Sequence, residues 1–199
     1  MKAIREKVEL PEGHSFRVLR WSKTLRDVEC ILGPGRTQPL QGEGNHWHFH
    51  KEMELTLFTG GEGTRFVGDA IGTFAAGDLV LLGERLPHHW HTSSASSGLS
   101  IQWHFPESHP VWAFPENLEL RDLFKRAERG LHLRGRTATA IAALMQDVAR
   151  SKGAGQLAAL LRLLAEVADA PESDLALLSS RSFTLSAESH YQKAISKSV

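Results

Sequence analysis

Residues 42–61 read GEGNHWHFHKEMELTLFTGG, and the fold assignment rests on the spacing within this stretch. It fits the pattern G-x5-H-x-H-x3-E-x6-G, whose fixed positions are filled by Gly42, His48, His50, Glu54 and Gly61. At ordinary residue usage, five fixed positions coincide by chance with a probability on the order of 10⁻⁷ per starting point. The stretch is therefore treated as a motif rather than as a coincidence.

The spacing of the polar residues has a direct physical meaning. His48 and His50 lie two positions apart, so on a strand their side chains point to the same face. A turn near Lys51 would bring Glu54 back on the neighbouring strand. Two imidazoles and a carboxylate that converge inside a small barrel predict a site for a metal ion or a polar ligand.

A second motif follows at residues 77–88, GDLVLLGERLPH. Together the two stretches resemble the paired signatures of the cupin family, the second of which is G-x5-P-x-G-x2-H. Gly77 and His88 fit that pattern, whereas Gly83 stands where proline is usual and Arg85 where glycine is usual. The resemblance implies a cupin double-stranded β-helix, or jelly-roll, barrel. It also implies four metal ligands, His48, His50, Glu54 and His88.

The sequence around these motifs resembles that of the sensory domains of AraC-type transcription regulators, over roughly residues 10 to 170. The matching segments are ELTL at 54–57, GEG at 61–63, RFVGD at 65–69, GDLVLLG at 77–83, LPH at 86–88 and Trp90. In that family, helices after the barrel form the usual dimer surface, and a DNA-binding domain follows. The resemblance therefore implies a regulatory domain that senses a small molecule.

Composition limits the remaining function classes. The 199 residues contain 23 Lys and Arg and 23 Asp and Glu, so the net charge is zero. A DNA-binding domain normally carries a basic stripe, and we expect contact with DNA only through a domain that this chain lacks. The single cysteine excludes an internal disulfide, which suits a cytoplasmic protein. No apolar run reaches the ~18 residues of a membrane span, so no membrane partner is expected.

The first 112 residues predict a β-barrel domain. Short segments with strand character alternate with turn residues, which favours a sandwich or barrel over a parallel α/β sheet. The expected strands are 14–21, 27–32, 45–50, 53–59, 64–67, 70–74, 79–82, 88–92 and 99–105.

Residues 113–170 predict a helical segment. Apolar residues recur at helical spacing in 117–129, 137–152 and 156–168, and the short break at 153–155 predicts an antiparallel helical hairpin. The hairpin could bury its apolar stripes against the outer face of the barrel or form a dimer seam. We expect a homodimer through residues 137–168. Residues 171–199 are interpreted as a linker and the start of a truncated helix, with a short frayed tail as the alternative.

The metal site has an alternative that the residues leave open. Neutral imidazole and carboxylate suit a divalent transition metal such as Fe, Mn, Ni, Zn or Co, and their geometry seldom chooses among these. The same side chains could instead form a metal-free pocket for an organic ligand. Glu52 shares the strand parity of Glu54 and could replace it, although a position in solvent at the turn is favoured.

Four further residues are candidates for ligand binding. His46 precedes the motif by one strand repeat and would line the barrel mouth or lie on the surface. Gln102 and His104 share one face of the last strand, with Trp103 on the other, and the polar pair is expected to point inward. Arg65 could reach an anionic ligand, or it could be a solvated strand arginine.

Two functions from different classes remain. The first is a sensory domain for a small polar molecule, for example a sugar. The second is a metal-dependent cupin enzyme, such as a dioxygenase or a sugar-phosphate isomerase, whose metal would bind substrate in open coordination positions. His104 is its only ready acid/base candidate. We favour the sensor with a bound metal.

Overall fold

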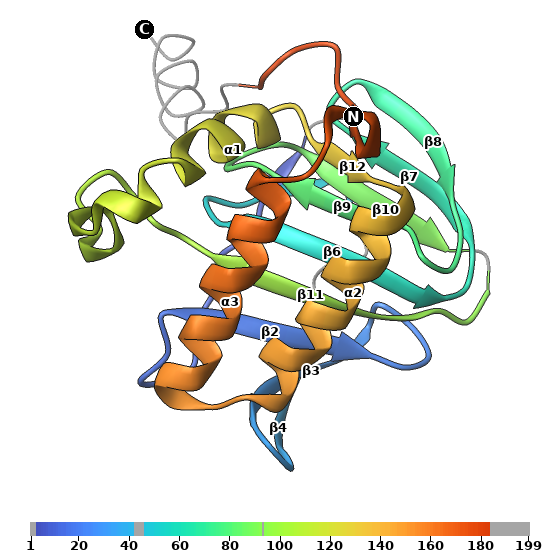
Figure 1. Ribbon diagram of the computed structural model, residues 1–199. Coiled ribbons are helices and arrows are strands. Elements are labelled where there is room, and N and C mark those ends of the chain that lie inside the picture. Colours follow the sequence, from blue (N-terminus) through green and yellow to red (C-terminus); the bar gives the residue numbers. More distant parts are fainter. Residues whose placement is uncertain (1–2, 42–45, 93, 184–199) are drawn as a thin grey trace, which may run out of the picture.

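The computed structural model describes residues 3–41, 46–92 and 94–183. Within these ranges the strands form two sheets that face each other (Figure 1). The smaller sheet has the order β1 (Ile4–Arg5), β5 (His48–Phe49), β10 (His88–Thr92), β7 (Gly63–Val67) and β8 (Ala70–Phe74). The larger has the order β13 (Leu175–Leu177), β12 (Leu131–Leu133), β9 (Leu79–Leu82), β6 (Met53–Gly60), β11 (Ser97–Trp103), β2 (Phe16–Trp21), β3 (Asp27–Gly33) and β4 (Arg36–Gln41).

Side-chain alternation separates the two faces of the larger sheet. On β6, Leu55 and Leu57 belong to a core that also contains residues of the helices, whereas Phe58 belongs to a second core shared with the smaller sheet. Successive strand residues point to opposite faces, so Glu54 and Thr56 share the inner face with Phe58. The interior of the barrel is therefore apolar around Phe58 and polar around Glu54.

The helices follow the barrel in the chain. They are η1 (Pro110–Ala113), η2 (Pro115–Asn117), α1 (Leu120–Ala127), α2 (Gly135–Arg150), α3 (Gly153–Ala168) and η3 (Glu172–Asp174). Figure 1 shows α2 and α3 side by side across the outer face of the larger sheet. Ile141 and Val148 of α2 and Leu160 and Leu164 of α3 are fully buried in the core beneath them. The mainly β fold with a helical hairpin is thus confirmed, and the hairpin packs on the barrel. The dimer through 137–168 remains a prediction.

Four strands lie where the sequence predicted none, namely β1, β4, β12 and β13. β4 is an edge strand that contains Pro39, and proline weakens a strand pattern. Leu131–Leu133 pairs with β9, and Leu175–Leu177 pairs with it in turn, so the larger sheet extends beyond residue 112. Residues 175–177 of the segment interpreted as a linker are consequently part of the sheet. A three-residue strand shows too little alternation to be recognised in sequence. The expected terminal helix, with its stripe of Tyr191, Ile195 and Val199, lies outside the described residues.

None of the helices in the described part of the chain is long and apolar enough to cross a membrane.

Candidate metal and ligand site

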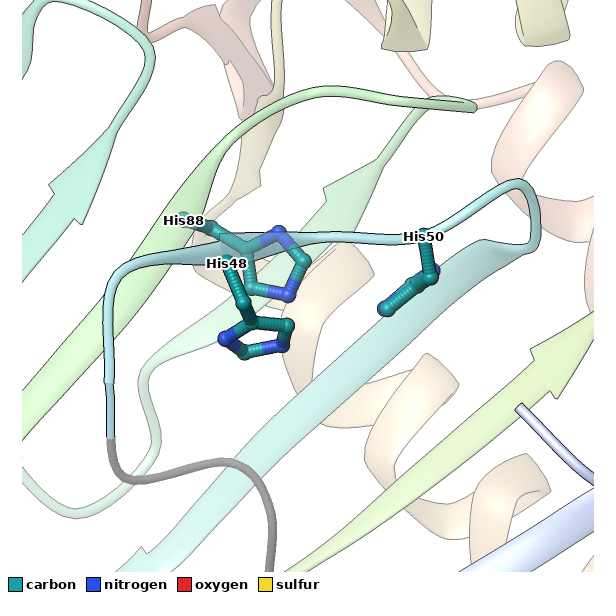
Figure 2. Close-up of side chains that lie close together, drawn as sticks. All are labelled: His48, His50 and His88. Carbon is teal, nitrogen blue, oxygen red and sulfur yellow. The ribbon is translucent and has the colours of Figure 1, made fainter. Parts of the chain in front are cut away.

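The two sequence motifs meet inside the barrel. His48 lies on β5, His50 follows directly after it, and the chain turns before Glu54 on β6. His88 begins β10 and stands opposite His48 in the antiparallel register. Figure 2 shows His48 and His50 descending from one segment, with the ring of His88 close to that of His48. The ring centroids of His48 and His88 are 4.3 Å apart, and those of His50 and His88 are 5.0 Å apart.

The donor atoms of this group converge. His48, His50 and His88 each offer a ring nitrogen within 4.8 Å of the others. Oε2 of Glu54 lies 3.0 Å from Nε2 of His50 and 3.8 Å from Nε2 of His88. All four side chains are buried. Ligands about 2.1 Å from one ion lie at most about 4.2 Å apart, so only a small closure would place three nitrogens on one metal.

Backbone carbonyls fix the orientation of all three imidazoles. Nδ1 of His48 is 2.7 Å from the carbonyl of residue 46, Nδ1 of His50 is 3.0 Å from that of residue 52, and Nδ1 of His88 is 2.8 Å from that of residue 86. A carbonyl oxygen only accepts hydrogen bonds, so each Nδ1 carries the proton. The Nε2 atoms of all three rings are thereby directed inward, as in protein metal sites whose ligands are held by outer-shell acceptors. On the neutral rings of His48 and His88 this atom carries a lone pair, whereas Nε2 of His50 faces Glu54.

Burial and neighbouring charge set the protonation of the group. Burial lowers the pKa of His48 to about 4, and burial together with His48 lowers the pKa of His88 well below its ordinary value. Burial alone would lower the pKa of His50, but the hydrogen bond and the negative charge of Glu54 outweigh burial, so the pKa of His50 is raised. Burial would raise the pKa of Glu54, but His50 and His88 hold it well below its usual range. The result is a carboxylate beside two neutral imidazoles.

The surroundings of two ring nitrogens test whether these residues fit a metal ion. Nε2 of His88 is buried and has no hydrogen-bond partner among the residues that the structure describes. Nε2 of His48 lies 3.1 Å from Oε2 of Glu6. Because His48 is neutral with its proton on Nδ1, this contact brings two lone pairs together unless a metal ion or a proton lies between them. The donor set therefore fits a divalent transition metal held by His48, His50, Glu54 and His88. Such an ion would act as a Lewis acid for an oxygen-bearing ligand.

A cavity of about 390 Å³ opens beside this group. Its polar lining includes Glu6, Arg17, His48, Glu54 and Gln102. Its apolar lining includes Trp21, Leu25, Val28, Phe58 and Trp90. Ligand pockets typically measure ~300–1,000 Å³, so the cavity has room for one small molecule.

Gln102 connects the metal-type ligands to a buried arginine. Its amide nitrogen donates to Glu54 at 2.6 Å, and its amide oxygen accepts from Nε of Arg17 at 2.6 Å. Arg17 also contacts Oε1 of Glu6 at 3.4 Å. Sequence reasoning missed Glu6 and Arg17, because no local motif links them to residues so distant along the chain.

The other predicted ligand-binding residues lie in different surroundings. Gln102 points inward, as expected, and Trp103 points outward into the helix-packed core. His46 is half-buried and its ring centroid is 5.3 Å from that of His48. His104 pairs with Glu84 at 3.1 Å and lies outside the cavity lining.

Arg65 lies neither in the cavity nor in solvent. Its guanidinium is buried and contacts both carboxylate oxygens of Asp78 at 2.5 Å, and His132 lies 3.1 Å from the same carboxylate. The structure thus places Arg65 in an internal ion pair, where Asp78 neutralises its charge.

Glu52 also departs from expectation. It is buried, at 3% exposure, rather than placed in solvent. Its backbone carbonyl accepts from Nδ1 of His50, and its carboxylate lies 3.8 Å from the same nitrogen. Because Nε2 faces the site, Glu52 lies on the far side of the ring, where it orients His50 and does not replace Glu54.

Comparison with known proteins addresses the fold. No protein-family model matches the sequence, and no curated protein matches it. Among solved structures, the AraC-like transcriptional activator CuxR is 13% identical, with 95% of this chain and 68% of CuxR covered at a TM-score of 0.50. ToxT from Vibrio cholerae is 12% identical, with coverage of 93% and 66% and a TM-score of 0.44. A cupin 2 conserved barrel domain protein from Salinispora arenicola is 20% identical, with coverage of 48% and 70% and a TM-score of 0.31.

The protein has a cupin fold. It resembles the AraC-like transcriptional activator CuxR in fold, over 95% of this chain. At these identities the likeness concerns the fold alone, so the function of this cupin has to be argued from its own residues.

Proposed function

We propose that this cupin is a small-molecule-sensing domain of the AraC type that holds a divalent transition metal. The observation that carries the proposal is the convergence of three Nε2 atoms and the Glu54 carboxylate on the wall of a cavity. The metal and the cavity together form one binding site, in which His48, His50, Glu54 and His88 hold the ion and the cavity admits a ligand.

Sensing requires that the occupied site favours one conformation of more distant segments. A short chain of contacts supports such coupling. The carbonyl of Pro87, next to His88, accepts from the backbone N–H of Gly68 at 2.8 Å. Asp69, the next residue, accepts from Oγ of Ser179 and from the N–H of Ser180, both at 2.8 Å. The β7–β8 turn therefore links a proposed metal ligand to the segment that leaves the larger sheet.

Hydrogen–deuterium exchange of the full chain tests this coupling. We compare chain stripped with a chelator and chain reloaded with Fe, Mn, Ni or Zn. We expect the reloaded chain to show slower exchange at the site and also in residues 171–183. In Asp69→Ala the change at the site should persist while the change in 171–183 is lost. A response confined to the site in the unsubstituted chain would contradict sensing.

The enzyme alternative keeps one supporting observation. Glu6 places a second carboxylate beside His48, where it could move a proton, whereas His104 is engaged with Glu84 away from the cavity. Oxygen consumption or isomerisation by the metal-loaded chain, lost on Glu6→Gln, would favour the enzyme over the sensor.

A further inference from the structure

We infer that the cavity selects an uncharged aromatic compound that carries a hydroxyl or carbonyl oxygen, such as a phenol or an aryl alcohol. This inference rests on the proposed function, because it names the ligand class of the same site. Three independent features of the cavity lead to it.

The first feature is an aromatic wall. Trp21 and Phe58 meet edge to face with ring centroids 5.2 Å apart, and Phe58 and Trp90 lie 6.0 Å apart. Aromatic rings favour edge-to-face and offset contacts with further rings. Gly98 on β11 lies under Trp21, and a Cβ there would overlap the indole. The wall is therefore built into the sheet and favours a planar apolar body in the ligand.

The second feature is a pair of buried polar groups that line the cavity. Ser100 is 5% exposed and Trp90 4% exposed, yet Oγ of Ser100 and Nε1 of Trp90 have no hydrogen-bond partner within residues 3–41, 46–92 and 94–183. Buried polar groups nearly always have a partner, and an indole N–H can only donate. An oxygen atom on a ligand suits each group, since it accepts from the indole N–H of Trp90 and pairs with the hydroxyl of Ser100.

The third feature is the charge balance. Arg17 is the buried cation of the cavity, and it is already engaged by Gln102 at 2.6 Å, by Oε1 of Glu6 at 3.4 Å and by the carbonyl of Glu9 at 3.4 Å. Lys7 is exposed and pairs with Glu9. In the metal-free chain a carboxylate or phosphate ligand would meet Glu6 and Glu54 without a spare positive charge, so this form of the cavity favours an uncharged ligand.

These features argue against the sugar expected from the sequence. A sugar presents hydroxyl groups on all sides and loses their hydration when it enters a pocket, so each needs a partner there. Trp21, Leu25, Val28 and Phe58 offer none through their side chains toward the ligand, since Nε1 of Trp21 already donates to Ser96.

Calorimetric titration of the full chain, both chelator-treated and metal-loaded, tests the ligand class with three probes. Cinnamyl alcohol and cinnamate share one skeleton and differ in charge, and glucose represents the sugars. We expect the chelator-treated chain to bind the alcohol at least about tenfold more tightly than cinnamate, which corresponds to about 1.4 kcal/mol. Glucose should not bind to either form.

Ser100→Ala distinguishes a ligand-contacting hydroxyl from a structural one. It should weaken binding of cinnamyl alcohol about tenfold. At the same time it should leave the melting temperature of the ligand-free chain unchanged or raise it, because a buried hydroxyl without a partner is removed. The control is Ser97→Ala on the same strand, whose hydroxyl bonds to Thr59 at 2.9 Å outside the cavity lining. It should leave the affinity unchanged.

The outcomes separate this inference from the proposed function. If cinnamate or glucose binds as tightly as the alcohol and Ser100→Ala weakens it, the ligand class is wrong while the cavity remains a ligand site. If no probe binds, or if Ser100→Ala has no effect on affinity, the inference is also overturned. The exchange experiment on residues 171–183 then decides the sensing function independently.

Discussion

The side chains around Glu54 show how single residues prepare the site. The amide oxygen of Gln102 accepts from Arg17, which turns its amide nitrogen toward Glu54 as a hydrogen-bond donor. Each imidazole is likewise held through the nitrogen that faces away from the site. Partners of this kind typically change metal affinity by ~10–100-fold.

Gln102→Leu should therefore lower metal affinity by about 10–100-fold while the barrel still folds. The substitution removes a 2.6 Å hydrogen bond to Oε2 of Glu54. Competition with a chromophoric chelator measures the affinity, and Gln38→Leu on the exposed edge strand β4 is the matched control. Equal affinities for the two variants would show that Gln102 does not position Glu54.

The backbone conformation at Arg85 shows why glycine is usual at this position of the cupin pattern. This residue has a φ of 59°, in the left-handed region that glycine adopts without strain, and glycine is the residue usual at this position of the motif. Its backbone N–H donates to the carbonyl of His50 at 2.8 Å, so the conformation ties the second motif to the first.

We expect Arg85→Gly to leave the free energy of unfolding unchanged or to raise it by up to about 1 kcal/mol, because relief of the left-handed strain offsets the added flexibility of the unfolded chain. Urea denaturation measures the change. Arg36→Gly, within strand β4, is the comparison and should destabilise by about 0.5–1 kcal/mol. If Arg85→Gly lowered the free energy of unfolding as much as Arg36→Gly, the backbone conformation at Arg85 would not be strained.

At the scale of elements, sequence patterns located the main strands and helices because their periodicities are long enough to be read. The four proposed metal ligands could be named because two local motifs contain them. The short strands β1, β12 and β13 could not be located, since two or three residues carry little pattern. The edge strand β4 was missed as well, because Pro39 interrupts its strand character. Glu6, Arg17 and Ser100 became visible only when distant strands were placed side by side, and the burial of Arg65 depends on Asp78 from a different element.

The helical hairpin has two faces that can be tested separately. Leu160 is fully buried against the barrel, whereas Leu157 of the same helix is 38% exposed. Leu160→Ala should lower the free energy of unfolding by about 2–5 kcal/mol through lost burial and cavity formation. Leu157→Asp should leave the fold intact but weaken the predicted homodimer. Light scattering at tens of micromolar gives the mass, and a monomer in the unsubstituted chain would contradict the dimer.

For the whole molecule, the two sheets enclose one site in which both motifs take part, while the helical hairpin packs on the outer face of the larger sheet. The smaller sheet supplies His48 and His88, the larger supplies Glu54 and Gln102, and the segment after β1 adds Glu6. The barrel therefore has to be assembled before the donor atoms converge. This dependence makes metal content a direct report on the proposed site.

The most direct measurement is elemental analysis of the purified, untagged chain and its histidine variants after incubation with Fe, Mn, Ni and Zn. We predict near-stoichiometric metal in the unsubstituted chain and in His91→Ala, whose side chain is exposed on the same strand as His88. Metal should be lost in His88→Ala and in the double variant His48→Ala/His50→Ala, while circular dichroism shows that all variants fold. No metal in the unsubstituted chain, or equal metal in all four proteins, would contradict the metal site.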